Sequence, residues 1–383
     1  TKQSDDLIQI PVLNTNKKLL FYAQGVTTWK NGSNLEYLQY QHPYATEAFY
    51  FVTDREDITR LSINEIPTAQ VNGGNNITTY TECVFYEKES TSPCESGHYL
   101  VGDDFRFSTS HDYKFTLENY IIGTPIKVKT AFAAKLTGGN GGLLSFTANG
   151  TQLEKTSDDN IESNAASSNS MITTTQTVKE FTSESPNVNF SIKFTPSGTV
   201  NSANLDFITV NYTAQLSASC TFNTSTTTSK QDVIVLSGAN ESTRVWDITT
   251  HYNPVEIKGT LNSNEYSFSP IEQGTRKYIA FNSNNYTQAK ITEKISNQNI
   301  HGEATPDMII ITPAEFKAQA QRIADLHLQL DSMRVLVVEQ QKVFNEFSSG
   351  TPDFMAYRKM AKMFYDRGSD EKGHKLGYVL LFG

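Results

Sequence analysis

The stretch "PDMIIITPAEFKAQAQRIADLH", residues 306–327, decides the fold class of the C-terminal part of this chain. The run "DMIII" (307–311) is nearly continuously apolar, which is typical of a strand covered on both faces of a parallel sheet. A helix is expected in "TPAEFKAQAQRIADLHLQL" (312–330). We expect Thr312 as its N-cap, Pro313 at the first helical position and Glu315 completing a capping box.

The same alternation repeats toward the C-terminus. A second buried strand is predicted in "MRVLVVE" (333–339), and a second helix in "TPDFMAYRKMAKMFYDRG" (351–368), stopping at Gly368. A third strand is predicted in "LGYVLLF" (376–382). This strand-helix-strand-helix-strand order predicts a parallel sheet with right-handed crossovers.

A parallel sheet of three strands is not a finished domain, and the chemistry of such folds sits at the carboxyl ends of the strands. The chain ends at Gly383, directly after the third predicted strand. We therefore expect a piece of a longer protein. The third strand would leave an unpaired edge and an apolar face, so we expect the isolated piece to aggregate or to be locally disordered after about residue 305.

The composition upstream favours β-sandwiches. Of the 383 residues, 37% are hydrophobic, yet 18 Tyr and 22 Phe raise the aromatic share to 11%. This balance suits strands that bury one face only. Period-two runs such as "PIKVKTAFAAKL" and "LDFITVNYTAQL" predict such strands, whereas the polar stretch 156–177 predicts a long loop.

The predicted fold is therefore multidomain, with all-β sandwich or jelly-roll domains followed by the first part of an α/β parallel-sheet domain. The predicted divisions are an N-terminal β domain (1–115), a jelly-roll-like sandwich (116–218), a β-rich segment with a linker (219–304) and the α/β segment (305–383). The sequence leaves open whether the β regions form two or three domains, and whether 1–115 packs with 219–304.

Charge and hydropathy exclude some classes of partner. The net charge is −9 with no basic block, so nucleic acid is not an expected partner. No run of about 18 apolar residues predicts a membrane-spanning helix. The N-terminus lacks the features of a signal peptide, and the Asn/Ser/Thr-rich sequence favours an extracytoplasmic protein whose signal has been removed.

Three cysteines are present, Cys83, Cys94 and Cys220. Cys83 and Cys94 flank a short loop, and a disulfide between them would stabilise the chain by about 2–3 kcal/mol; two unpaired thiols are the alternative. Cys220 is left over and is expected to be a small buried hydrophobe rather than a nucleophile.

The C-terminal segments carry a resemblance to a known family. The stretches 306–327, 343–368 ("VFNEFSSGTPDFMAYRKMAKMFYDRG") and 377–383 ("GYVLLFG") resemble the opening of the catalytic domain of gingipain-like cysteine peptidases, and most of all the sortase of the bacterial type IX secretion system. The most specific part is "NEFSSGTPD". Upstream runs such as "HPYATEAFYFVTD" (42–54) and "RVWDITTHYNPVEIKG" (244–259) are similar to segments that precede this domain.

This resemblance implies a caspase-like α/β domain with a His/Cys dyad, in which the thiolate attacks a carbonyl and the His handles the proton. It implies a cell-surface enzyme at the bacterial outer membrane that removes C-terminal sorting domains from secreted cargo and attaches the cargo to lipopolysaccharide. An outer-membrane barrel protein would serve as its anchor. Cargo identity, the acceptor amine and the partner are not named by the sequence.

The family's His and Cys segments match no position up to Gly383. The resemblance therefore implies no catalytic residue in this chain, which we predict to be inactive alone, and no cofactor or metal. His374, His327 and His301 are expected to be loop or helix histidines. A Cys220–His251 dyad would require an independent site in a β region and is disfavoured.

Two acidic loops and one glycine-rich loop resemble binding motifs only in composition. Asp103 and Asp104, and also Asp158, Asp159 and Glu162, could coordinate calcium, but neither group has EF-hand spacing. Solvated carboxylates are expected instead. "TGGNGGLL" (137–144) lacks the Lys-Ser/Thr pair and the helix of a phosphate loop, so a hairpin turn is predicted.

Besides the enzyme hypothesis, two others remain. The β-sandwiches could form a non-catalytic extracellular binding module for a protein or glycan, which exposed aromatics on one sandwich face would favour. A purely structural surface protein would leave the α/β segment unexplained.

Overall fold

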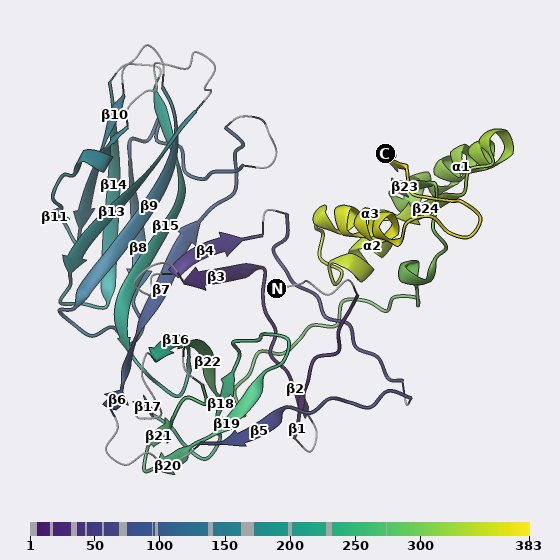
Figure 1. Ribbon diagram of the computed structural model, residues 1–383. Coiled ribbons are helices and arrows are strands. Elements are labelled where there is room, and N and C mark those ends of the chain that lie inside the picture. The colour runs from purple at the N-terminus through teal and green to yellow at the C-terminus, as the bar shows by residue number, and fades with distance from the viewer. Residues whose placement is uncertain are drawn as a thin grey trace. The chain divides into compact units, whose positions relative to one another are not determined.

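The computed structural model describes most of the chain, in two compact units (Figure 1). The described ranges are 6–15, 18–31, 37–42, 44–55, 57–68, 75–93, 95, 99–136, 141–161, 172–197, 201–226, 232–272 and 274–383. One unit comprises residues 28–43 and 63–287. The other comprises 1–27, 44–62 and 288–383.

The first unit contains a sandwich of two antiparallel sheets. One sheet has the order β11-β10-β14-β8, with β12 also paired to β10, and the other has the order β13-β9-β15-β7. The strands of the first sheet are β8 (Ser110–Thr116), β10 (Gly142–Ala148), β11 (Thr151–Gln152), β12 (Asn160–Ile161) and β14 (Asn187–Pro196). Those of the second are β7 (Thr79–Glu87), β9 (Pro125–Lys135), β13 (Thr173–Thr182) and β15 (Ser202–Gln215).

Two more sheets of this unit form a second pair, in the orders β16-β22-β18-β19-β5 and β20-β21-β17-β6. The strands of one are β5 (Asn64–Pro67), β16 (Cys220–Thr226), β18 (Thr243–Asp247), β19 (Val255–Lys258) and β22 (Gly274–Asn282). Those of the other are β6 (Asn75–Ile77), β17 (Asp232–Ser237), β20 (Thr260–Asn262) and β21 (Glu265–Phe268). A separate pair consists of β3 (Thr27–Asn31) and β4 (Tyr37–Gln41).

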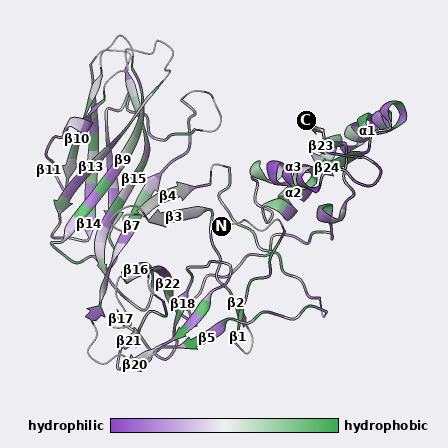
Figure 2. Cartoon of the chain, in the orientation of Figure 1, coloured by the Kyte–Doolittle hydropathy of each residue, from purple (hydrophilic) through white to green (hydrophobic). Residues whose placement is uncertain are grey.

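Period-two burial along the strands builds one continuous core. In β14 and β10, buried positions alternate with half-buried or exposed ones, and Figure 2 shows apolar and polar residues mixed along the strands. The rings of Phe268 and Tyr278 meet between the facing sheets of the second pair, with centroids 5.2 Å apart. Tyr80 and Phe222, 5.9 Å apart, join this core to that of the first sandwich.

Strand pairing over long sequence distances changes the predicted division of the β region. The predicted boundary after residue 115 falls inside β8, and β7 and β8 belong to the same sandwich as β9 to β15. β5 and β6 pair in parallel with β19 and β17, so part of the N-terminal region completes the sheets of 219–304. Local patterning cannot reveal such pairings, because it specifies strands and not their partners.

Two loop predictions were wrong in part. The polar stretch 156–177 contains a 3₁₀ turn (Ser157–Asp159), β12 and the start of β13, whose threonines alternate between half-buried or buried and exposed positions. The predicted hairpin at 137–144 instead connects two sheets, because β9 and β10 lie in different sheets. Residues 137–140 themselves lie outside the described part.

The position of Gly142, at the start of β10, has no room for a side chain. A Cβ atom at this position would lie 2.2 Å from a ring carbon of Phe194, which is buried in the sandwich core. We expect Gly142→Ala to lower the free energy of unfolding by about 1–3 kcal/mol, because the ring would have to move in a close-packed core. Thermal unfolding checks this, with Ser145→Ala on the same strand as control. An unchanged midpoint in Gly142→Ala would contradict it.

The second unit holds the α/β part, and the predicted fold class is confirmed there. Its parallel sheet has the order β24-β23-β25. Its elements are β23 (Met308–Thr312), a 3₁₀ turn (Ala314–Phe316), α1 (Lys317–Asp331), β24 (Val335–Glu339), α2 (Gln340–Phe347), α3 (Met355–Arg367) and β25 (Tyr378–Leu381). Upstream lie the pair β1 (Leu13–Thr15) and β2 (Lys18–Leu20), and a 3₁₀ turn (Ile300–Gly302).

The central strand β23 is covered on both faces, as its apolar run predicts. Ile309 and Ile311 belong to a core shared with α2 and α3, whereas Ile310 packs with Ala320 and Ala324 of α1. β25 pairs only with β23 among the described strands, and Tyr378, Val379 and Leu381 are exposed.

Helix boundaries differ from those expected. Thr312 ends β23 and Phe316 caps α1, so the predicted capping box does not form. Ala320 of α1 is buried, but Leu330 near the end of the same helix is exposed. The short helix α2 was not predicted, and Gly368 follows α3 with φ 71°, as expected for a C-terminal stop. None of the described helices is both long and apolar enough to cross a membrane.

Candidate functional site

The carboxyl edge of the parallel sheet is where chemistry is expected in this fold. β23 ends there at the buried Thr312, and β24 ends at Glu339, whose carboxylate contacts Lys317 Nζ at 2.7 Å. The hydrogen bond from Lys317 lowers the pKa of Glu339. Residues 312–316, 339–342 and 381–383 are all described and contain no Cys or His. The described residues at this edge therefore supply neither a thiol nor an imidazole.

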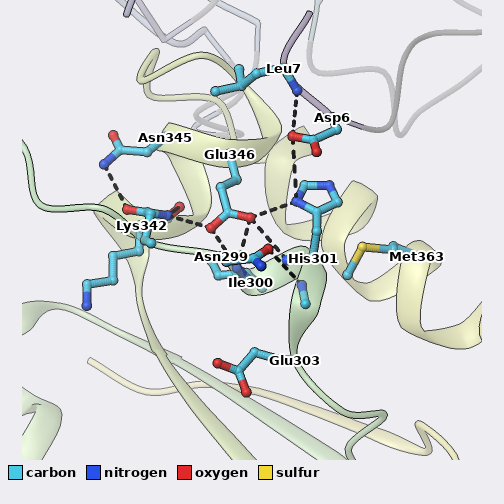
Figure 3. A network of polar contacts seen from close by, with 12 residues as sticks. Asp6, Leu7, Asn299, Ile300, His301, Glu303, Lys342, Asn345, Glu346 and Met363 are labelled. Carbon is cyan, nitrogen blue, oxygen red and sulfur yellow. Dashed lines mark hydrogen bonds and ion pairs between the residues drawn. The ribbon is translucent and has the colours of Figure 1, made fainter. Parts of the chain in front are cut away.

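The buried carboxylate of Glu346 on α2 binds residues 298–301, which lie shortly before β23 (Figure 3). Glu346 accepts hydrogen bonds from the backbone nitrogens of Ile300 (2.7 Å) and His301 (3.1 Å). His301 Nδ1 lies 2.6 Å from the same carboxylate. Gln298 Nε2, two residues before the 3₁₀ turn, donates to Glu346 at 2.8 Å.

The electrostatics of Glu346 fit a structural acceptor. Burial alone would raise the pKa of Glu346, but hydrogen bonds from Ile300, Gln298 and His301 outweigh it, so the pKa is lowered. A carboxylate held ionised by several donors is a poor general base. The His301 ring is also fixed, because it stacks on Phe347 with centroids 4.5 Å apart. This Glu346 clamp therefore positions the chain that leads into β23.

N-terminal residues reach the same unit. Asp6 Oδ1 lies 3.9 Å from His301 Nδ1. Phe49 O accepts a hydrogen bond from Ser349 Oγ at 2.9 Å, and Tyr44 meets Phe354 edge-on at 4.9 Å. The "NEFSSGTPD" segment, the most specific part of the sequence resemblance, is thus held by residues about 300 positions upstream.

A small pocket of about 200 Å³ lies beside the clamp. It is bordered by residues 297–300, by β24 residues 336–339 and by the side chains of Glu303, Lys317 and Lys342. Both lysines and both glutamates of this border are surface groups, and the Lys317–Glu339 pair neutralises one of each. The pocket therefore carries no strong charge preference.

The opposite edge of the sheet carries His374, as the sequence predicted for a helix-to-strand loop. His374 Nδ1 lies 2.7 Å from Asp307 Oδ2, at the start of β23. Arg334 contacts Asp370 at 2.6 Å and donates to Thr305 O at 2.8 Å. These contacts tie together the amino ends of the strands, away from the edge where catalysis is expected.

The remaining candidates are explained by local partners. His327 pairs with Asp331 at 2.8 Å on α1, and the Cys220 thiol donates to Ser217 O at 3.1 Å, whereas His251 packs edge-on against Tyr252. No described contact joins Cys220 to His251.

Most of the carboxylates considered as calcium ligands have hydrogen-bond or ion-pair partners within the chain. Asp103 accepts from Tyr86, Tyr113 and Lys88, and Asp104 from Arg106 N. Asp159 is not solvated as expected but buried against Lys179, while Asp158 is exposed; Glu162 lies outside the described residues.

One acidic cluster was missed by sequence reasoning. Carboxylate oxygens of Glu87, Glu89 and Asp206 lie within 4.8 Å of one another. Burial and the hydrogen bond with Glu89 raise the pKa of Glu87 to about 8, and burial raises that of Asp206 to about 6. Burial and the close approach of these groups therefore disfavour the ionised forms of Glu87 and Asp206.

The described thiols are expected to be unreactive. Burial and the nearby Glu82 raise the pKa of Cys83 to about 12, and burial raises that of Cys220. Because the thiolate is the nucleophile, we expect both residues to react with iodoacetamide at pH 7 at least about 100-fold more slowly than a model thiol. Peptide mapping after timed alkylation checks this, with unfolded chain as control. Rapid labelling of the folded chain would contradict it. Cys94 lies outside the described residues, so the Cys83–Cys94 bridge stays a prediction.

The chain was compared with known protein families and solved structures. Residues 301–383 match the model of peptidase family C25, so the match begins at His301, which the Glu346 clamp holds. Latent PorU from Porphyromonas gingivalis, solved as a dimer, matches with a TM-score of 0.80 and 25% identity over 98% of this chain. The chain resembles PorU. The resemblance inferred from residues 306–383 is thereby confirmed.

The PorU match includes the β-sheets as well as the α/β part, because it leaves out only about 2% of this chain. The chain in turn covers 37% of the PorU chain. The Cry8Ea1 and Cry4Aa toxins of Bacillus thuringiensis also match, at 16% and 10% identity, over 38% of this chain and 26% and 25% of theirs. Their TM-scores are 0.24 and 0.21. No curated protein sequence matches the chain.

Proposed function

We propose that this chain is the N-terminal region of a cell-surface cysteine peptidase and sortase of the type IX secretion system. The parent protein would remove C-terminal sorting domains from secreted cargo and attach the cargo to lipopolysaccharide. The observation that carries the proposal is the similarity to PorU over 98% of the chain, together with the peptidase family C25 match at residues 301–383.

Within this function, the chain supplies scaffolding rather than chemistry. The parallel sheet would present its carboxyl edge to a His/Cys dyad contributed from beyond Gly383. The Glu346 clamp would fix where β23 begins, and the Phe49–Ser349 contact would fix the loop before α3. The β-sheets would be accessory parts, and an outer-membrane barrel protein would anchor the whole at the cell surface.

Deletion of the gene in its native host tests the proposal. Secreted cargo is expected to keep its C-terminal sorting domain and to lose the lipopolysaccharide-dependent shift in electrophoresis. Complementation with the native gene should restore both, and complementation with a Cys→Ala variant of the thiol labelled by a peptidase-directed probe should restore neither. Normal cargo processing in the deletion strain would refute the proposal and favour the non-catalytic binding module.

A further inference from the structure

The first sandwich carries a pocket that the peptidase function does not use. It has a volume of about 290 Å³ and lies between β7 and β8, the edge strands of the two sheets. Asp103, from the segment between these strands, also lines it. Ligand pockets range from about 300 to 1,000 Å³, so there is room for one small ring rather than for a long chain.

Aromatic rings form part of the pocket wall. Tyr86 of β7 and Tyr113 of β8 lie with ring centroids 4.9 Å apart and a 59° tilt, and Phe115 lines the pocket next to them. Such rings offer apolar faces, and the two tyrosines add polar tips. A ligand with both C–H faces and hydroxyl groups matches this combination.

The tyrosine hydroxyls are fixed before any ligand arrives. Both donate to Asp103 Oδ2, Tyr86 at 2.8 Å and Tyr113 at 3.1 Å, and Lys88 Nζ contacts Asp103 Oδ1 at 3.2 Å. Burial alone would raise the pKa of Asp103, but these hydrogen bonds lower it, so the carboxylate stays ionised as their acceptor. The oxygens of Tyr86 and Tyr113 retain lone pairs that can accept from a ligand. Fixed groups lose little entropy on binding.

The charges around the pocket are balanced. Asp103 faces Lys88, and the lining residue Asp112 has Lys114 two positions away on the same strand. No excess of positive charge favours a phosphate or carboxylate ligand, and no excess of negative charge favours a cation. His111 also lines the pocket; its Nε2 lies 3.3 Å from Asp104 O, which leaves Nδ1 as the ring nitrogen that can bond a hydroxyl. The chemistry therefore favours a neutral, hydroxyl-rich ligand.

We propose that this pocket binds a single neutral hexose unit of a glycan. The sugar's C–H face would lie against the Tyr86 ring, because Tyr113 is buried. Its hydroxyls would bond the tyrosine oxygens, the Asp112 oxygen that does not accept from Ser191 Oγ, and His111 Nδ1. This inference does not depend on the peptidase function, since the pocket lies wholly within the sandwich. An extended peptide adding to the edge of β8 is the competing occupant.

Saturation-transfer NMR on the complete 383-residue chain tests the pocket. The probes are the methyl glycosides of glucose, mannose and galactose, and a Kd of about 1 mM is expected for at least one of them. Tyr86→Ala and Asp112→Ala are expected to weaken that binding at least tenfold, and Tyr86→Phe to weaken it less. Tyr252→Ala removes an exposed tyrosine of the same unit outside the pocket and is expected to change nothing.

The outcomes are distinct. Unchanged binding in Tyr86→Ala, in a chain that melts like the parent, would place the sugar elsewhere and overturn the proposal. Absence of saturation transfer from all three glycosides at about 10 mM would also overturn it. Binding of an extended heptapeptide without any hexoside signal would assign the β8 edge to peptide addition instead. If Tyr86→Ala melts early, Asp112→Ala at the exposed rim decides the question.

Discussion

Replacing Lys179 with methionine is expected to lower the free energy of unfolding of the first sandwich by about 3–5 kcal/mol. Lys179 Nζ lies 2.7 Å from Asp159 Oδ2, and both side chains are nearly inaccessible, at 4% and 2% exposure. The variant would leave the Asp159 charge buried without its partner. Removal of one member of such a pair costs far more than the pair itself contributes.

The surroundings of the pair strengthen this expectation. Lys179 Nζ also donates to Glu154 O at 2.8 Å and lies 5.3 Å from the centre of the Phe146 ring. Asp159 additionally accepts from Thr156 N at 2.9 Å. The ammonium group thus ties β13 to the segment leading into the 3₁₀ turn, and methionine would replace none of these bonds.

Amide hydrogen exchange in β13 and β14 measures the effect, because it reports on this sandwich without the other unit. Lys193→Met, at an exposed position of β14, is the matched control and should change little. Lys179→Met combined with Asp159→Asn should lose at least about 1 kcal/mol less than the sum of the single losses, since no unpaired charge remains. Strict additivity would mean that the buried charge is not the cause.

Replacing Glu346 with alanine is expected to free the segment 298–302. The variant would leave the buried nitrogens of Ile300 and His301 and the Gln298 amide without their acceptor. Buried donors left unsatisfied cost about 1–3 kcal/mol each, so we expect a total of about 3 kcal/mol after relaxation. The Ile300 and His301 amides should then exchange about 100-fold faster.

Glu346→Gln separates charge from shape. It keeps one carbonyl acceptor, so a smaller acceleration is expected. Glu315→Ala, at an exposed position before α1, is the control. Unchanged exchange at Ile300 in Glu346→Ala would show that Phe347 stacking and the N-terminal segments suffice to hold this part of the chain.

The same carboxylate predicts a pH dependence. The pKa of Glu346 in the folded chain is lower than its ordinary 4.5. Its stabilisation is therefore complete above about pH 4.5 and is lost as the pH falls through the folded pKa. Protection of the Ile300 amide should decline with acid in the parent chain and decline less in Glu346→Gln. Parallel declines in the two chains would contradict this.

The α/β segment was largely predictable from sequence. The apolar run of β23 and the Gly368 stop specify their elements locally, because burial on both faces and a left-handed backbone each require particular residues. The order of the strands then implied a parallel sheet. The helix α2 was missed because its buried residues, from Val343 to Phe347, follow a strand without a turn signal.

For the candidate site, the sequence predicted only which residues are not catalytic. The sequence predicted His374 to be a loop histidine, and the structure places it beside Asp307 at the amino edge of the sheet. The Glu346 clamp and the sandwich pocket could not be predicted. In the Glu346 clamp, Glu346 lies 45 or more positions after the residues that it binds. The lining of the sandwich pocket comes from two different strands and the segment between them.

The sequence by itself determined the type and order of the elements, since periodicity, apolar runs and helix stops act within a few residues of one another. Only the tertiary structure decided which strands pair and which charges are buried. β5 and β6 join sheets built from residues more than 150 positions away, and Asp159 meets Lys179 inside a core rather than in solvent. The physical reason is that pairing and desolvation depend on what the whole chain packs against a residue, and no local pattern carries that information.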